Sequence, residues 1–208
     1  MQKKVIATLL AAAGLFSAVG VQAADEGSFM VRARAVSISW DNKNNDGLQD
    51  AGVGKVSAKD LWIPEVDFSY FFTKNLALEL VLTYPQQVDI HTASLGKIGH
   101  VEALPPSLVA QYHFTDLGMF KPYVGLGVNY TMFTKNSFNT GLGKVSVDRD
   151  SLGFVAQVGA DFALNKNWSV NVDVKYITME TDVRLGGSKI GSLDLNTITA
   201  GIGVGYRF

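Results

Sequence analysis

Eight runs of alternating apolar and polar residues, joined by connections of alternating length, constrain this chain most strongly. Three short polar turns alternate with four long polar stretches, which together span 41–60, 73–75, 85–103, 115–121, 134–150, 163–167 and 178–194. An antiparallel meander of eight strands needs seven connections, and in a membrane barrel the short turns gather at one end and the long loops at the other. The sequence therefore predicts an all-β, eight-stranded antiparallel transmembrane β-barrel with short periplasmic turns and long extracellular loops.

One face of each predicted strand carries no charged residue. Successive side chains of a strand point to opposite faces, and the strand 76–84 has leucine at 76, 78, 80 and 82 on its uncharged side. A soluble ligand-binding barrel with its apolar face inward would also alternate. Aromatic placement favours the membrane, because residues such as Tyr70 and Phe72 mark the short-turn end and Trp62 and Tyr84 the long-loop end. Two bilayer interfaces select two such rings.

The N-terminus has the pattern of an export signal. Lys3 and Lys4 precede an apolar stretch that ends in a small-residue cleavage site at Ala23. We therefore expect residues 1–23 to be a cleaved signal peptide and residues 24–208 to form one outer-membrane barrel domain. Beyond the signal no apolar run approaches 18 residues, which excludes a helical membrane protein.

Composition excludes several classes of function. Removal of the signal leaves 16 basic against 19 acidic residues, a net charge of about −3, and this balance argues against a nucleic-acid-binding surface. The chain has no cysteine, hence no disulfide framework and no thiolate site. We expect no cofactor, no metal ion and no catalytic residue.

Several ordered segments carry a family resemblance. They are Phe72-Thr73-Lys74-Asn75-Leu76 with Glu79-Leu80, His100-Val101, Leu104-Pro105-Pro106, Ala110 to Phe114, Tyr123 to Thr131, Gln157 to Asp161 and Gly205 to Phe208. In this order they resemble the OmpW family of outer-membrane proteins over nearly the whole mature chain. The resemblance implies an eight-stranded barrel with a narrow apolar passage, associated with uptake of small hydrophobic molecules. It also implies that Tyr206 and Phe208 are an insertion signal, read by the outer-membrane insertion machinery.

The inward side chains divide by height within the barrel. Polar residues near the short-turn end are expected to form a plug, made of Arg32, Arg34, Asp67, Gln111, His113, Asp161, Asp173 and Arg207. Apolar residues near the long loops are expected to line a ligand cavity, made of Val36, Ile38, Trp40, Leu61, Ile63, Val81, Val109, Phe133, Val155, Ile177 and Met179. Eight strands enclose only enough space for side chains or one small ligand, so simple packing of these apolar residues remains the alternative.

Two consecutive prolines suggest an exit for an apolar ligand above the polar plug. Pro105 and Pro106 donate no backbone hydrogen bond, and a ladder gap facing lipid is costly unless it is used or covered. They therefore predict a lateral gate into the bilayer. The alternative is that the prolines simply end a loop.

Three further patterns are weaker. Residues 42–53 resemble a calcium-binding loop, but Val53 replaces the bidentate glutamate, and a solvated turn-rich loop explains the same residues. His113 and Ser107 share a strand face, but six residues of extended chain put them about 20 Å apart, too far for nucleophile and base. His91 and His100 lie in a predicted loop, where surface histidines are the simpler interpretation.

The sequence thus predicts a monomeric, porin-like protein of the bacterial outer membrane that passively admits small hydrophobic solutes. Its other expected partners are outer-membrane lipid and the insertion machinery. The alternative is a structural or surface-interaction barrel with a packed interior, whose loops bind partners.

Overall fold

The computed structural model describes residues 28–41, 56–58, 60–92, 96–138, 145–147, 150–185, 188–194 and 196–208. The predicted signal peptide (1–23) and the whole calcium-like segment (42–53) lie outside these residues. Among the described residues, no helix is long and apolar enough to cross a membrane.

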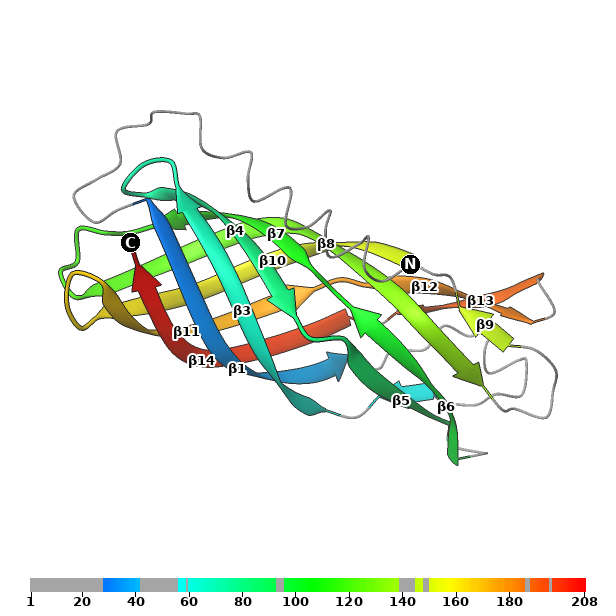
Figure 1. The fold of residues 1–208 in the computed structure, drawn as a ribbon. Helices are drawn as coiled ribbons and strands as arrows, with labels where there is room; N and C mark the ends of the chain where they lie inside the picture. The colour runs from blue at the N-terminus through cyan, green and yellow to red at the C-terminus, as the bar shows by residue number, and fades with distance from the viewer. Residues whose placement is uncertain are drawn as a thin grey trace.

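The predicted eight-stranded antiparallel barrel is confirmed (Figure 1). Its strands are β1 (Phe29–Asp41), β3 (Leu61–Phe71), β4 (Leu76–Thr83), β7 (Ser107–His113), β8 (Phe120–Phe138), β10 (Asp150–Ala163), β11 (Trp168–Ile177) and β14 (Asn196–Arg207). Neighbours follow the order β10, β11, β14, β1, β3, β4, β7, β8, and pairing of β8 with β10 closes the wall. Closure matters because every backbone donor in the hydrocarbon region needs a partner within the protein.

Further strands lie at the long-loop end, where β2, β5 and β6 continue the barrel sheet and β9, β12 and β13 form a separate three-stranded sheet. They are β2 (Val56–Ala58), β5 (Gln86–Thr92), β6 (Gly96–Leu104), β9 (Val145–Val147), β12 (Glu180–Leu185) and β13 (Ser188–Asp194). The sequence predicted polar loops here, and the structure corrects that prediction because these stretches pair as strands. β6 pairs with the upper part of β8, and β5 with β6. Their polar composition hid them, since strands outside the bilayer need no apolar face.

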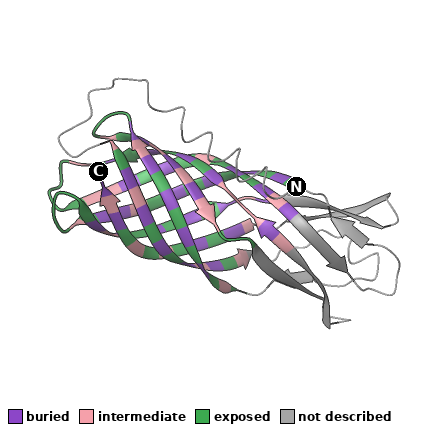
Figure 2. Cartoon of the chain, in the orientation of Figure 1, coloured by how far each residue is buried: buried purple, intermediate pink, exposed green. Residues whose placement is uncertain are grey.

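Burial alternates along the barrel strands, as Figure 2 shows by its alternating buried and exposed positions. On β3 the side chains at 63, 65, 67, 69 and 71 are buried, while Trp62, Phe68 and their neighbours on the same face are exposed. Exposed Leu126 and Phe154 show that the apolar face is the outer one. The orientation predicted from aromatic placement is therefore confirmed.

Aromatic side chains also contact one another at the short-turn end of the outer surface. Trp168, Tyr206 and Phe208 form consecutive edge-to-face pairs, with ring centroids 4.9 and 4.8 Å apart. Phe29 and Tyr70 form a further pair across β1 and β3 at 4.9 Å. Amphipathic rings of this kind suit the membrane interface.

Glycines on the inward face of β14 make room for two arginines of β1. A Cβ on Gly203 would lie 2.1 Å from the Ala33 carbonyl oxygen and 2.7 Å from the Cγ atom of Arg34. A Cβ on Gly205 would lie 3.2 Å from the Cγ atom of Arg32. Because these glycines carry no side chains, this part of β14 leaves room for the long cations of β1 to cross the interior.

Candidate functional site

The lower interior is filled by a network of buried polar side chains. We call this set the polar network, and it consists of Arg32, Arg34, Glu65, Asp67, Ser69, Glu79, Gln111, His113, Tyr123, Gln157, Asp161, Asn171, Asp173 and Lys175. These side chains point inward because successive residues of a strand alternate between its two faces. They come from β1, β3, β4, β7, β8, β10 and β11. Five carboxylates face three cations, so the network is dense in charge yet shielded from lipid.

Arg32 connects opposite sides of the wall. Its Nε and Nη2 atoms donate to the two carboxylate oxygens of Asp161 at 3.1 and 2.7 Å. Its Nη1 atom lies 3.2 Å from Glu79 and 3.3 Å from Asp67, and it donates to Ser69 at 2.9 Å. The guanidinium carbon also lies 5.3 Å from the centroid of the Tyr123 ring. Bidentate guanidinium–carboxylate pairs hold both position and orientation, so Arg32 ties β1 to β3, β4 and β10.

Arg34 and Lys175 complete the upper layer of the network. Arg34 contacts Glu65 at 2.9 Å, Asp67 at 2.7 Å and Asp173 at 2.9 Å. Lys175 contacts Glu65 at 2.8 Å and Asp173 at 3.3 Å. Each cation of this layer has several carboxylate partners, so the layer does not depend on any single hydrogen bond.

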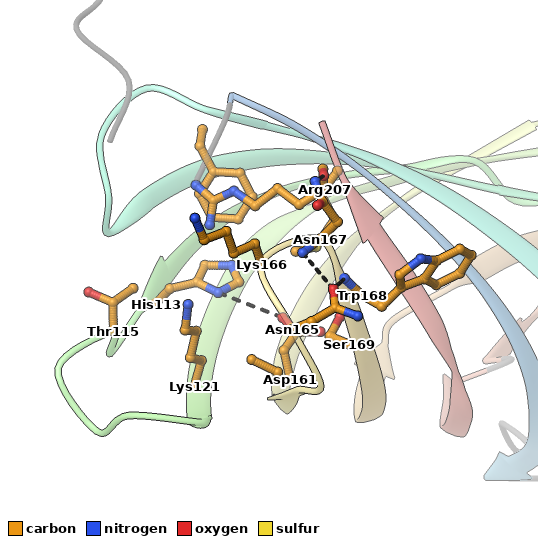
Figure 3. Close-up of a pocket in the computed structure, with 13 residues that line it drawn as sticks. His113, Thr115, Lys121, Asp161, Asn165, Lys166, Asn167, Trp168, Ser169 and Arg207 are labelled. Carbon is orange, nitrogen blue, oxygen red and sulfur yellow. Dashed lines mark hydrogen bonds and ion pairs between the residues drawn. The ribbon is translucent and has the colours of Figure 1, made fainter. Parts of the chain in front are cut away.

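His113 lies at the lower edge of the network. Its ring stacks on Tyr123 at 4.8 Å, and its Nε2 atom is 3.0 Å from Gln111 Oε1. Its Nδ1 atom is 4.0 Å from Asp161 (Figure 3). Gln111 in turn donates to Gln157 at 3.0 Å. The amide and ring contacts place His113 within the packed wall of the network, six residues along β7 from Ser107.

A small cavity of about 30 Å³ lies below His113, at the short-turn end. Lys121, Lys166 and Arg207 line it together with His113 (Figure 3). Arg207 lies lower than the other predicted plug residues, with its guanidinium carbon 3.9 Å from the centroid of the Phe71 ring. A cavity of this size holds about one water molecule, so it is no passage for a solute.

The upper interior holds a cluster of apolar side chains, with a few buried polar side chains such as Asn129 and Thr131 beside it. The eleven residues predicted to line a cavity all have their place here, and we call them the apolar cluster: Val36, Ile38, Trp40, Leu61, Ile63, Val81, Val109, Phe133, Val155, Ile177 and Met179. Nine of them are buried, and Trp40 and Leu61 are partly buried. Val109, Val155, Ile177 and Met179 pack together, as do Val36, Ile38 and Ile63, with Trp40 against both groups. Side chains therefore pack against one another in this half.

An interruption in the wall lies beside Pro105 and Pro106. The β4–β7 ladder ends with the pair Val81 and Ser107, and the β5–β6 ladder starts with Gln86 and Ala103. Between them, in the part of the chain that the structure describes, 82–85 and 104–106 form no ladder pairs with each other. We call these two facing segments the window. On the other side the wall is continuous, because the register with β8 runs across the prolines without a shift.

Sequence reasoning missed part of the polar network. The predicted plug did not include Glu65, Glu79, Lys175 or Tyr123, all of which are buried in the network. The sequence offered one signal for these partners. Arg32 and Arg34 lie on the same face of β1, and a buried arginine needs carboxylate partners.

The described side chains do not support the weaker patterns. His91 and His100 lie on β5 and β6, strands rather than a loop, and their side chains lie outside what the structure describes. In the described part of the chain, no three His, Asp or Glu side chains are placed to hold a metal ion together. The calcium interpretation of 42–53 stays a prediction.

Comparison with known proteins places the chain among outer-membrane barrels. The profile of the OmpW family matches residues 25–208. Outer membrane protein W of Escherichia coli is 34% identical over 215 residues, covering 99% of this chain and all of the relative. An outer-membrane protein of Sinorhizobium fredii, y4mB, is 36% identical over 186 residues, covering 86% and 80%. The crystal structure of OprG from Pseudomonas aeruginosa superposes with a TM-score of 0.70 at 28% identity, covering 88% of this chain and 96% of that one.

Proposed function

This chain belongs to the OmpW family of outer-membrane proteins, and on that premise we propose that it passively admits small hydrophobic molecules through the outer membrane. The observation that carries the proposal is the division of the interior into two halves. The upper half is lined by the apolar cluster, and the lower half is closed by the polar network. An apolar solute arriving from the long-loop end meets compatible side chains first and charges afterwards.

The polar network supports a route that stops halfway down the barrel. Arg32 and Arg34 are fully buried at the side chain and are paired with carboxylates from four further strands. Separating a buried ion pair costs several kcal/mol for each ion left uncompensated. An apolar solute offers no hydrogen bonds to offset that cost, so passage straight through the network is strongly disfavoured.

The window supports a sideways exit. It interrupts the wall between β4 and β7, next to Val109 and Val81 of the apolar cluster. Lipid tails lie outside this part of the wall, where Leu108 is exposed. An apolar solute leaving between 82–85 and 104–106 would pass from the cluster into hydrocarbon without crossing a charge. In this proposal Pro105 and Pro106 form the lateral gate.

Uptake by vesicles tests the proposal. The purified protein is reconstituted into vesicles whose outer leaflet contains lipopolysaccharide, and the fluorescence rise of N-phenylnaphthylamine reports arrival of an apolar solute in the phospholipid leaflet. We expect faster arrival than in protein-free vesicles, with no change in glucose permeability because the polar network stays closed. Equal rates with and without protein would contradict the proposed function.

The double variant Pro105→Ala/Pro106→Ala tests the gate. Alanine restores two backbone donors, so the ladder across the window can close. We expect the variant to fold and its excess uptake of N-phenylnaphthylamine to fall to the protein-free rate. As a control, Pro122→Ala changes a proline of β8 away from the window and should leave uptake unchanged. Undiminished uptake by the double variant would remove the gate while leaving the upper apolar half as a binding site.

The close packing of the apolar cluster favours a second candidate, a structural or surface-interaction barrel whose loops bind partners. Val36, Val109 and Val155 are at most 1% exposed, as expected for an interior that is only a core. This candidate predicts no flux in the vesicle assay and a phenotype that follows replacement of the long loops. In both cases we expect a monomer in lipid that the insertion machinery recognises through Tyr206 and Phe208.

A further inference from the structure

The small cavity at the short-turn end has a buried floor and an exposed rim (Figure 3). His113, Ser169 and Arg207, which line its inner part, are each at most 5% exposed. Lys121 is half-buried, and Lys166, in the turn between β10 and β11, is exposed. The cavity therefore opens toward the short-turn side of the barrel, below the polar network.

One hydroxyl group at the floor of this cavity has no hydrogen-bond partner among the described residues. Ser169 lies on the inward face of β11, and its Oγ atom is buried without a partner. Gly205 of β14 pairs with Ser169 and leaves room for the hydroxyl, because a Cβ on Gly205 would lie 2.7 Å from this Oγ atom. A buried hydroxyl without a hydrogen bond is costly, and an ordered water or an ion is the usual explanation. Since Ser169 lines the cavity, its hydroxyl can serve a bound group there.

Positive charge dominates the lining of the cavity. Three cations, Lys121, Lys166 and Arg207, line it against a single carboxylate, Asp161, which leaves an excess of two positive charges. The carboxylate is directed at the polar network, because its two oxygens accept hydrogen bonds from Arg32 at 3.1 and 2.7 Å. Lys121 and Arg207 each have further interactions, yet their charges still act on the space between them. This excess is local, since the whole chain has a net charge of −1.

A phosphate group matches this lining in charge, in hydrogen bonding and in size. A phosphate dianion balances two positive charges, and its oxygens accept hydrogen bonds from ammonium, guanidinium and hydroxyl groups. The cavity volume of about 30 Å³ has room for one phosphate oxygen, as it has for one water molecule. The remaining oxygens would stay at the rim beside Lys166. A chloride ion could fill the floor but would not reach the rim, and an apolar solute offers no acceptor.

We propose that this cavity binds a phosphate group on the periplasmic side of the barrel. The site is independent of the proposed uptake, because the polar network lies between the cavity and the apolar cluster. One phosphate oxygen enters the cavity and accepts from Ser169 and Arg207, while the outer oxygens accept from Lys121 and Lys166. The bound anion thereby joins β8, β11, β14 and the turn between β10 and β11. Free phosphate in the periplasm and the headgroups of inner-leaflet phospholipids offer the same chemistry.

Titration with inorganic phosphate tests the site in the purified protein, folded in dodecyl maltoside micelles and followed by its backbone amide signals. We expect saturable shifts at Lys166 and Ser169 and none at Val109 of the apolar cluster. Chloride at equal ionic strength should produce much smaller shifts. Phosphate should also raise the temperature of thermal unfolding, because it binds the folded protein. Absence of saturable shifts at Lys166 and Ser169 would overturn the site.

Two single substitutions separate the site from general attraction of anions. Lys166→Gln removes one charge of the rim and Ser169→Ala the hydroxyl of the floor, and each should weaken phosphate binding about tenfold, the scale of one hydrogen bond to a charged group. Lys74→Gln is the matched control, because Lys74 is an exposed lysine of another short turn and does not line the cavity. It should leave the dissociation constant unchanged. Equal weakening by Lys166→Gln and Lys74→Gln would refute a specific site.

Stability without phosphate distinguishes a binding role of Ser169 from a structural one. Ser169→Ala removes a buried hydroxyl that has no partner among the described residues, so it should not lower the temperature of thermal unfolding in phosphate-free buffer. The variant should instead lose most of the rise that phosphate produces in the wild type. Equal losses with and without phosphate would mean that Ser169 only supports the fold, and the proposed floor contact would be wrong.

A short-chain phospholipid distinguishes the two sources of phosphate. Dihexanoylphosphatidylglycerol, used below the concentration at which it forms micelles, presents a phosphodiester with a single charge. Tighter binding of inorganic phosphate, which the charge of the cavity favours, assigns the site to free phosphate, and tighter binding of the lipid assigns it to headgroups. Lys166→Gln must weaken whichever probe binds. Binding of neither probe would overturn the proposal.

Discussion

The two halves of the barrel interior are closed by different forces. In the lower half, long charged side chains from opposite strands meet in multiple ion pairs, as Arg32 does with Asp161 at 2.7 Å. In the upper half, apolar side chains such as Val36 and Val155 fill the space mainly by packing against one another. An apolar solute can replace packed side chains with contacts of the same kind, but it cannot replace a carboxylate. In one barrel, the lower half can therefore resist entry of an apolar solute while side chains of the upper half can be displaced by it.

Removing a central cation of the polar network is expected to lower the free energy of unfolding more than any other change considered below. Arg32→Met leaves Asp161, Asp67 and Glu79 buried without one of their shared partners. We expect the free energy of unfolding to fall by about 3–5 kcal/mol, as for other broken buried ion pairs. Urea unfolding in lipid vesicles, followed by tryptophan fluorescence, measures the change. A loss below about 1 kcal/mol would mean that water enters the network and screens it.

Filling the space that Gly203 leaves beside Arg34 is expected to have the next largest effect on the free energy of unfolding. In Gly203→Ala the new methyl group would meet backbone atoms of Ala33 and Arg34 at 2.1 and 2.7 Å. Backbone cannot move aside cheaply, so we expect destabilisation of up to about 3 kcal/mol. Gly201→Ala is the matched control, because its nearest contacts are side-chain atoms of Asp173 and Val36 at 3.0 and 3.2 Å. Equal unfolding curves for the two variants would contradict the close fit of β1 and β14.

Shortening a side chain of the apolar cluster is expected to cost less. Ile177→Ala removes a buried side chain that packs with Val155 and Met179. We expect a loss of about 2 kcal/mol in the free energy of unfolding, the lower end for such truncations. Uptake of N-phenylnaphthylamine should not slow, because the change leaves more room for a solute. A fall in uptake would show that the packed cluster itself, and not the space it encloses, supports function.

The smallest effect is expected from an ion pair outside both halves. Lys74 contacts Asp116 at 3.2 Å across two short turns, and both side chains are more than half exposed. Water screens such a pair, so Lys74→Gln should cost at most about 1 kcal/mol. The same urea titration measures it. A loss comparable with that of Arg32→Met would remove the distinction between sealed interior and solvated surface.

The fold could be predicted because lipid acts on each strand separately. Every barrel strand must present apolar side chains outward and may hide polar ones inward, so alternation within eleven residues of β3 already identifies both faces. The β5–β6 extension lies beyond that constraint and was predicted as loop. For the same reason β8 (Phe120–Phe138) runs past the start of the predicted loop 134–150, because its upper end pairs with β6 beyond the bilayer.

The contacts within the candidate site were harder to predict from the sequence than the fold was. Arg32 and Asp161 are 129 positions apart, and which inward residues meet depends on how the strands are staggered around the barrel. Both prolines of the window could be seen in the sequence. That the interruption lies toward β4 only depends on how β4, β7 and β8 pair with one another.

Sequence alone determined that this protein is an outer-membrane barrel, which side of each strand faces lipid, and which residues are hidden inside. Those properties follow from two-residue periodicity, a local pattern imposed by the solvent on either side of the wall. Tertiary structure alone decided which hidden charges pair and where the ladder is interrupted. These depend on barrel closure, because only a closed and staggered sheet brings side chains from distant strands within hydrogen-bonding distance.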